Sequence, residues 1–401
     1  MDNTDTHSRL ELMQENKNLI DEIFQLEQDG HKDARELYSD EIAGYLVRTD
    51  DGSYTLTSDK RDNQESETLH SRYGAITESY EKFVKPSGLL EVSKYKDTIR
   101  VLDICSGIGY NVAALLNYMK DEDVEIVIDM IESSVETLTT SLFIPDVTNS
   151  YSYIKKAVES YLIENEYLKF TKVVSHIPSN IHININVCDA REFIKNRAEG
   201  EYDAVFLDPY SPSKSPELYS VDFFKHLYQY LTSDALILTY TAASPVRSAL
   251  IHAGFYVGEG PRFHRSGGTI ASKNIQLIET PLSVSDEKVI ALSDVGIPFI
   301  DPDLDADFDT IINRRQGTRQ KIRGVSVFPS SSKLPRYLGV DPETIEDEAL
   351  RNKLNNYVKD MGFDSINDDR ILEILDIDYG LSSRDQVLQL EDNLKNVLSN
   401  N

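Results

Sequence analysis

Apolar and polar residues recur along the chain with two different periods. Between residues 12 and 24 the apolar side chains return at helical spacing, which predicts an amphipathic helix. From about residue 99 the pattern changes to short apolar runs that alternate with helical stretches, typical of a parallel sheet covered by helices on both faces. The runs expected to form strands are 99–104, 124–131, 181–187, 202–207 and 235–240. We therefore predict an α/β fold built on a doubly wound, mostly parallel sheet.

The regions outside these runs predict how the rest of the chain is organised. The polar stretch 49–67 contains a hairpin turn at 50–53, and helical spacing occurs at 111–119 and over most of 147–175. Residues 281–302 have the composition of a loop. We expect five consecutive parts: an N-terminal helical segment at 1–50, an entry segment at 51–98, the α/β domain at 99–282, a basic, loop-rich segment at 283–340 and an acidic helical extension at 341–401.

Charge is distributed unevenly along this framework. The chain of 401 residues has a net charge of -27, which argues against a nucleic-acid partner because phosphate binding depends on Lys and Arg. Between residues 314 and 336, however, seven basic residues occur without an acidic one: Arg314, Arg315, Arg319, Lys321, Arg323, Lys333 and Arg336. This stretch is either an ordinary solvated surface or a surface for phosphates, with Arg314, Arg315 and Arg319 as its first contacts.

Composition also limits where the protein can act. No apolar run reaches the length of a membrane helix, and the first thirty residues are too polar for a signal peptide. The two cysteines are too few for a structural zinc site and are typical of reduced thiols. We therefore expect a cytoplasmic protein with no membrane anchor and no bound metal.

The turn after the first predicted strand is rich in small residues. It begins at Asp103 and contains Gly107 and Gly109, which permit positive φ and a close approach of an adenosyl group to the backbone. A dinucleotide site would need a third glycine where Val112 stands. The loop is thus either a plain strand-to-helix turn or a nucleoside site whose contacts are Asp103, Cys105, Ser106, Gly107 and Gly109.

Acidic residues follow the next three predicted strands. Glu132 is placed to accept hydrogen bonds from both ribose hydroxyls. Asp189, with the amide of Ala190 beside it, is placed to receive an adenine amine, although it can equally cap the helix that begins there. Asp208 precedes a proline-rich loop, where a carboxylate can orient an amine or take its proton. Together these positions predict an S-adenosyl-L-methionine site with Asp208 at the reacting end.

The chain resembles the methyltransferase half of MnmC, a family that completes 5-methylaminomethyl-2-thiouridine at the tRNA wobble position, and its stand-alone relatives. The similar segments are 70–79 (His-Ser-Arg-Tyr-Gly-Ala-Ile-Thr-Glu-Ser), 107–111 (Gly-Ile-Gly-Tyr-Asn), 206–219 (Phe-Leu-Asp-Pro-Tyr-Ser-Pro-Ser-Lys-Ser-Pro-Glu-Leu-Tyr) and 239–255. The resemblance covers about residues 70–271. It departs from the family at Cys105, where glycine is usual, and at Pro209-Tyr210, where a glycine-aromatic pair is usual.

The resemblance implies a Rossmann-like class I S-adenosyl-L-methionine-dependent methyltransferase that N-methylates an aminomethyl group on a wobble uridine of tRNA. It implies Asn111 at the donor and Asp208 and Tyr240 near the amine. It also implies tRNA as partner, and a separate enzyme that prepares the amine because no second dinucleotide-binding signature is present. The substrate contacts that it implies are Arg72, Glu78, Lys214 and Arg247.

Three other interpretations stay open at this point. An aminopropyltransferase of the spermidine-synthase kind shares the sheet and an aspartate after the fourth strand, but Ser106 and Ser211 fit its pattern poorly. A methyltransferase for a small molecule or a protein agrees with the acidic charge. An inactive donor-binding subunit that associates with RNA or scaffolds other proteins would use the acidic C-terminal region for protein contacts.

Overall fold

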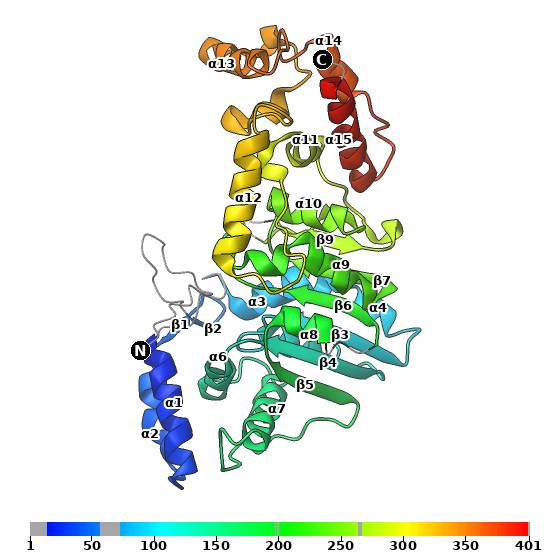
Figure 1. The fold of residues 1–401 in the computed structure, drawn as a ribbon. Helices are drawn as coiled ribbons and strands as arrows, with labels where there is room; N and C mark the ends of the chain where they lie inside the picture. Colours follow the sequence, from blue (N-terminus) through cyan, green and yellow to red (C-terminus); the bar gives the residue numbers. More distant parts are fainter. Residues whose placement is uncertain (1–13, 57–72, 197, 199, 264–266, 400–401) are drawn as a thin grey trace.

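The computed structural model describes residues 14–56, 73–196, 198, 200–263 and 267–399. Its centre is a seven-stranded sheet of order β5-β4-β3-β6-β7-β9-β8, in which β3 to β7 are parallel and β9 is antiparallel to both neighbours (Figure 1). The strands are β3 (Thr98–Ile104), β4 (Glu125–Glu132), β5 (Ile181–Val187), β6 (Tyr202–Leu207), β7 (Leu231–Thr239), β8 (Tyr256–Glu259) and β9 (Thr269–Ser272). The predicted doubly wound, mostly parallel sheet is confirmed.

Alternate side chains of the central strand enter two different cores. In β3, Ile99 and Val101 are buried on one face, and Leu102 and Ile104 are buried on the other. The first core includes α5 (Tyr110–Tyr118) and α7 (Tyr151–Glu164), and the second includes α8 (Ala190–Asn196), α9 (Val221–Gln229) and α10 (Ser244–His252). The strand patterns therefore reflect burial on both faces.

The predicted strands lie close to the observed ones. Residues 181–187 and 202–207 form β5 and β6 as expected, whereas β7 starts at Leu231, before the expected residue 235. The expectation for 147–175 is only half right, because α7 ends at Glu164 and the chain from 165 to 180 is not helical. Short helical turns connect the larger elements: α6 (Val135–Thr140), η3 (Ser141–Phe143), η4 (Pro216–Tyr219) and η5 (Ile275–Leu277).

The N-terminal part packs on the α7 side of the sheet. It consists of α1 (Gln14–Gln28), α2 (Ala34–Ala43) and a hairpin of β1 (Leu46–Arg48) with β2 (Tyr54–Leu56), followed by α3 (Ala75–Ser79), η1 (Tyr80–Val84), η2 (Lys85–Ser87) and α4 (Leu89–Val92). Arg35 on α2 joins this part to α7, since its Nε is 2.7 Å from Glu27 Oε1 and its Nη1 is 2.7 Å from Glu159 Oε1. The hairpin lies where the turn at 50–53 predicts it.

Helices continue beyond the sheet to the C-terminus. Figure 1 shows α12 (Phe308–Ile322) rising from the sheet toward α13 (Glu348–Lys359), α14 (Asp369–Leu375) and α15 (Ser383–Ser399), with α11 (Val284–Leu292) packed against α15. The turns between them are η6 (Asp294–Gly296), η7 (Ser331–Tyr337) and η8 (Pro342–Thr344). No helix of the described residues has the length and apolar character needed to cross a membrane.

Two expectations of loop structure are wrong in part. Helix α11 forms within residues 281–302, which were expected to be a loop, and both α11 and α12 form within the segment 283–340, which was expected to be loop-rich. Ser283 caps α11 by accepting from Asp286 N at 3.1 Å, and Asp307 caps α12 by accepting from Thr310 N at 2.6 Å. Only Ile311 of α12 is buried, so the helix shows little apolar periodicity. Its tertiary contacts, described below, come from arginines rather than from an apolar face.

Candidate active site

The carboxyl ends of three parallel strands bring the predicted acidic residues to one edge of the sheet. Ile104 of β3 is in register with Ile131 of β4 on one side and with Leu207 of β6 on the other. Glu132 and Asp208 each follow one of these partners directly. Ligands of open α/β sheets bind at this edge, so the expected residues share the place where a site can form.

The turn after β3 has a backbone that few side chains tolerate. Cys105, Gly107 and Gly109 have φ of 61°, 54° and 85°. A Cβ on Gly109 would lie 2.6 Å from Ile154 Cγ2 of α7, so the helix fills the space on that side of the turn. Cys105 adopts a left-handed conformation that costs a residue with a Cβ about 1–2 kcal/mol, and this is the position where the resembled family has glycine.

Replacement of Gly109 by Ala is expected to weaken donor binding at least about tenfold, because strained φ and the contact with Ile154 together displace the turn. Isothermal calorimetry with S-adenosyl-L-methionine measures the loss. Gly88→Ala is the matched control, since Gly88 also has positive φ (67°) but open space around its Cβ direction. Equal affinities for the two variants would show that the turn does not contact the donor.

Asp103 is a carboxylate with no solvent exposure at the end of β3. Burial, with a smaller contribution from the negative charge of Glu132, raises its pKa to about 7, while Ser106 and Asn111 lie close enough to moderate the shift. Neither carboxylate oxygen completes a hydrogen bond within the described part of the chain. Such unsatisfied buried oxygens are costly unless a ligand supplies the missing donors.

The carboxylate of Glu132 is held by backbone amides. Its Oε2 accepts from Gly107 N at 3.0 Å, and its Oε1 accepts from Ser133 N at 2.8 Å and Ser134 N at 3.0 Å. Burial raises its pKa, and these hydrogen bonds oppose the rise. A carboxylate has about four acceptor positions, so these three amides fix Glu132 and leave one position at Oε2 for a hydroxyl of a ligand.

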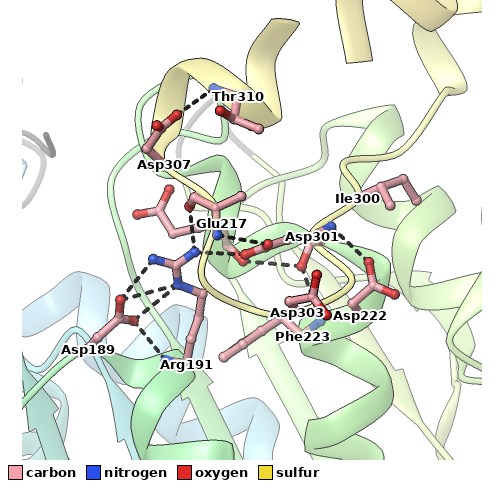
Figure 2. Close-up of polar contacts among 12 residues, drawn as sticks. Asp189, Arg191, Glu217, Asp222, Phe223, Ile300, Asp301, Asp303, Asp307 and Thr310 are labelled. Carbon is pink, nitrogen blue, oxygen red and sulfur yellow. Dashed lines mark hydrogen bonds and ion pairs between the residues drawn. The ribbon is translucent and has the colours of Figure 1, made fainter. Parts of the chain in front are cut away.

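Asp189 lies at one end of a polar junction that is centred on Arg191 of α8 (Figure 2). Its Oδ1 accepts from Arg191 N at 2.9 Å, which caps the helix, and its Oδ2 accepts from Arg191 Nη2 at 2.9 Å. Arg191 Nη1 also donates to Asp301 Oδ2 at 2.7 Å and to Ala306 O at 2.8 Å. The capping alternative is therefore present, and the same carboxylate is also paired with the arginine of the helix that it caps.

Asp208 is joined to the helix after the glycine turn. Asn111 Nδ2 donates to Asp208 Oδ2 at 3.1 Å. Burial raises the pKa of Asp208 well above its ordinary value, the charges of Glu78 and Asp103 raise it further, and Asn111 and Lys82 lower it. The site thus combines three carboxylates around one buried position, an arrangement suited to cationic ligands.

Two further side chains belong to this group and were not expected from the sequence. Lys82 Nζ lies 5.5 Å from the ring centroid of Tyr240 and 2.8 Å from Glu78 Oε1. Tyr219 is fully buried, and its pKa is raised by burial and by the nearby charges of Tyr240 and Asp208. The i,i+4 spacing of Glu78 and Lys82 could have predicted their ion pair from the sequence. No feature of the neighbouring sequence, however, predicts that this pair lies beside β6 and β7.

Several residues expected to contact the acceptor have other roles. Arg72 lies outside the described residues. Lys214 is buried within the turn after β6. Arg247 is 2% exposed and donates to Thr269 Oγ1 at 3.1 Å and Glu259 Oε2 at 2.8 Å. The expectation of phosphate contacts for Lys214 and Arg247 is wrong for this arrangement, because neither side chain faces the surface.

The three arginines at the start of the basic stretch hold α12 against the chain that precedes it. Arg314 Nη1 donates to Ile300 O at 2.7 Å, and Arg315 Nη2 donates to Val295 O at 2.8 Å. Arg319 Nη2 donates to Asp294 Oδ2 at 2.7 Å. Burial lowers the pKa of Arg315 to about 10. We therefore correct the idea that this triplet is primarily an RNA surface.

The arrangement fits an adenosyl donor. Three separate features lie at the carboxyl edge of the sheet, and each matches a different part of such a ligand. They are the two oxygens of Asp103 that lack hydrogen bonds, the carboxylate of Glu132 that backbone amides hold, and the tight turn at Gly109. Among the described residues, no group of three or more His, Cys, Asp or Glu side chains is placed to hold a metal ion.

Comparisons with known proteins identify the class of enzyme. A family model described as S-adenosyl-L-methionine-dependent methyltransferase matches residues 149–274. The chain is 36% identical over 279 residues to the uncharacterized protein MJ0670 of Methanocaldococcus jannaschii, covering 69% of this chain and 73% of that one. It is 44% identical over 63 residues to the bifunctional MnmC of Ralstonia nicotianae, covering 16% of this chain and 10% of that protein.

A solved structure gives a longer match. The crystal structure of MnmC2 from Aquifex aeolicus has 26% sequence identity and a TM-score of 0.56, and the alignment covers 78% of this chain and 94% of that chain. The resemblance to the MnmC methyltransferases is therefore confirmed, and the structural alignment covers more of the chain than residues 70–271, which contain the motifs. The chain belongs to the MnmC type of S-adenosyl-L-methionine-dependent methyltransferases.

Proposed function

We propose that this methyltransferase N-methylates the aminomethyl group on the wobble uridine of tRNA, in the cytoplasm. The observation that supports it most is the partly buried carboxylate of Asp208, which follows β6 and accepts a hydrogen bond from Asn111 at the start of α5, just after the glycine turn. The similarity to MnmC2 and to the MnmC proteins, whose name refers to tRNA 5-methylaminomethyl-2-thiouridine biosynthesis, supports the acceptor.

The donor would be held by residues from three strand ends. Glu132 would accept from the ribose hydroxyls, and Asp189 with the Ala190 amide would face the adenine. Asp103 would accept from the methionine amine, which provides the donors that its two oxygens lack. Cys105, Ser106, Gly107 and Gly109 would line the donor with backbone. Bound there, the donor supplies a methyl group on a cationic sulfur, and transfer exchanges that S–C bond for an N–C bond while the nitrogen loses one proton.

Asp208 would act on the amine rather than on the donor. The lone pair of the nitrogen must be free, so the protonated amine has to lose a proton near the site. A carboxylate whose pKa is raised by burial holds a proton more strongly and is the better base. Tyr240, beside Lys82, would bound the acceptor pocket. The chain would thus contribute alignment, exclusion of water and one proton acceptor.

Positive surface for tRNA would come from the later part of the basic stretch. Lys321 and Lys333 are exposed, and no ion pair involves either one within the described residues. Arg323 is also exposed, but its guanidinium donates to Ser331 Oγ and lies 3.9 Å from Asp294 Oδ1. Lys321 and Lys333, rather than the arginines, are therefore available for phosphates without loss of a structural contact.

Replacing Lys321 and Lys333 together by Ala is expected to weaken tRNA binding about threefold to tenfold at low salt. The slope of log affinity against log salt should fall by about 2, because two phosphate contacts are lost. Filter binding over a salt series measures both quantities. The control is the double Ala variant of Lys225 and Lys359, which removes the same charge from exposed positions on α9 and α13. Identical slopes in the two variants would remove this surface from the proposal.

The proposed reaction is tested with bulk tRNA from a strain that lacks the protein, incubated with labelled S-adenosyl-L-methionine. Mass spectrometry of the digested nucleosides should show one added methyl group on an aminomethyl-uridine. tRNA from a strain unable to install the aminomethyl group is the matched control and should stay unlabelled. Label in both preparations, or in neither, would contradict this acceptor. Methylation of the free nucleoside at a similar rate would indicate a small-molecule enzyme instead.

A further inference from the structure

Lys82 is a buried lysine in an unusual turn. It belongs to η1, a π-helical turn that follows α3, and its side chain is 3% exposed. Its ammonium forms an ion pair with Glu78 Oε1 at 2.8 Å, and Glu78 is itself only 12% exposed. Lysines are rarely buried unless they are paired, and π-helical turns occur frequently at functional sites.

The turn is fixed in place from three directions. The rings of Phe83 and Phe206 lie 5.8 Å apart, so η1 packs against β6 just before Asp208. Asn117 of α5 donates to Tyr80 Oη at 2.6 Å. Asp51 of the N-terminal hairpin accepts from Thr77 N at 2.9 Å and thereby anchors α3. The position of the Glu78–Lys82 pair is therefore set by three separate elements.

The charged groups around Asp208 come from every element packed against it. Glu78 and Lys82 face it from α3 and η1, and Asp103 faces it from β3. The remaining neighbours are polar: Asn111 from α5, Tyr219 from η4 and Tyr240 after β7. Among these groups Lys82 is the cation, against three carboxylates.

We propose that Lys82 is a positioning residue of the acceptor pocket: by its ion pair with Glu78 and its place over the Tyr240 ring, it sets the charge that the Asp208 carboxylate and the reacting groups experience. The proposal rests on the function proposed above, in which Asp208 faces the amine. Glu78 and Lys82 then act as an opposed pair, one favouring cations in the pocket and the other limiting how strongly they are held.

The chemistry explains why both charges are needed. Methylation brings a cationic sulfur and an amine together, and the amine reacts only when it is neutral. Three carboxylates without a counter-charge would hold the amine as an ammonium and would keep Asp208 protonated. Lys82 offsets one of them, so Asp208 can ionise and the amine can release its proton within the working pH range.

The first test needs no acceptor. The ratio of the dissociation constants of S-adenosyl-L-methionine, which has a sulfonium, and S-adenosylhomocysteine, which has a neutral sulfur, reports the charge at the reacting end. In Lys82→Met the ratio should fall about threefold to tenfold, because a repelling charge is gone, and in Glu78→Gln it should rise by a similar factor. The double variant and Lys82→Arg should lie near the unmodified protein. Calorimetry measures all of these affinities.

The second test is the pH dependence of kcat/KM with tRNA. Activity that requires ionised Asp208 rises as pH increases through its pKa. Lys82→Met should therefore move the acidic limb to higher pH, Glu78→Gln should move it to lower pH, and Lys82→Arg should restore it. The proposal would be overturned if both variants moved the acidic limb of the pH profile in the same direction. It would also be overturned if both variants lowered the rate while the acidic limb and the affinity ratio stayed unchanged, since that result indicates a packing role.

The two tests separate this inference from the function on which it rests. If tRNA is not methylated but the affinity ratios move in opposite directions, the acceptor is wrong and the charge pair stands. If tRNA is methylated and neither the affinity ratios nor the acidic limbs of the pH profiles move, the proposed role of the Glu78–Lys82 pair is wrong and the proposed tRNA acceptor stands. Should Lys82→Met fail to fold, Glu78→Gln and Lys82→Arg still give the decisive comparison, since the first preserves side-chain size and the second preserves the positive charge.

Discussion

Replacement of Asp208 by Asn is expected to reduce methyl transfer about a hundredfold to ten-thousandfold, the range found when a positioned proton acceptor is removed. The substitution keeps the size of the side chain and an oxygen that can accept from Asn111 Nδ2, so the turn and the strand end should not move. What is lost is the negative charge and the capacity to take a proton. Single-turnover assays with labelled donor and tRNA measure the effect.

Donor affinity distinguishes a chemical role of Asp208 from a structural one. Calorimetry should give a dissociation constant within a few-fold of the unmodified protein, because the expected donor contacts are at other strand ends. Asp234→Asn is the matched control, since this carboxylate is exposed on β7 and, among the described residues, accepts a hydrogen bond only from Asn274 Nδ2 at 2.9 Å. Transfer above about a tenth of the normal rate in the Asp208 variant would contradict its assignment as the proton acceptor.

Replacement of Arg191 by Met is expected to lower the free energy of unfolding by about 3–5 kcal/mol, the usual loss when one partner of a buried ion pair is removed. Asp301 is the reason, because its side chain is 1% exposed and would keep its charge without the guanidinium at 2.7 Å. Figure 2 shows that the same arginine also reaches Asp189. Chemical denaturation measures the loss, and donor affinity should fall as well because Asp189 loses the group that orients it.

A second substitution tests this explanation. Adding Asp301→Asn to Arg191→Met removes the unpaired charge and should recover part of the stability, whereas Asp189→Asn alone should cost less because Arg191 keeps Asp301 and the carbonyl of Ala306. A loss below about 1 kcal/mol for Arg191→Met would show that water reaches this junction and replaces the arginine.

The junction explains how the C-terminal helices are related to the donor edge. Asp301 N donates to Asp222 Oδ2 of α9 at 2.8 Å, and Lys195 of α8 donates to Asp303 O at 2.6 Å. Residues 301–307 lead directly into α12. The segment that holds the basic helix is thus attached to the two helices that follow β5 and precede β7, next to the expected adenine position.

The strands were predictable because their pattern is local. The run 202–207 is apolar and buried throughout, whereas the run 181–187 alternates apolar with polar residues at the edge of the sheet. Both runs are bounded by turn residues, so their limits follow from neighbouring residues alone. The glycine turn and the acidic residues after it are also local signals, since the carboxyl end of each strand has to meet the same edge. That is why the sequence alone predicts Asp103, Glu132 and Asp208 as one group.

The failures have the opposite cause. Arg247 and Arg315 look like surface cations in the sequence, and only the packing of other segments around them buries the first and commits the second to backbone carbonyls. Helix α12 was missed because it has no apolar stripe: Ile311 is its one buried residue among those described, and Arg314 and Arg315 donate to carbonyls of the preceding segment instead.

The parallel strands, the glycine turn and the acidic residues at the strand ends follow from the linear pattern of residues, because hydrophobic periodicity and turn chemistry act over short distances. The burial of Lys82, its ion pair with Glu78 beside Asp208, and the use of Arg191 to join Asp189 to Asp301 depend on segments that are far apart in the chain. A charge is costly or useful according to the groups that surround it after folding, so these roles exist only in the assembled fold.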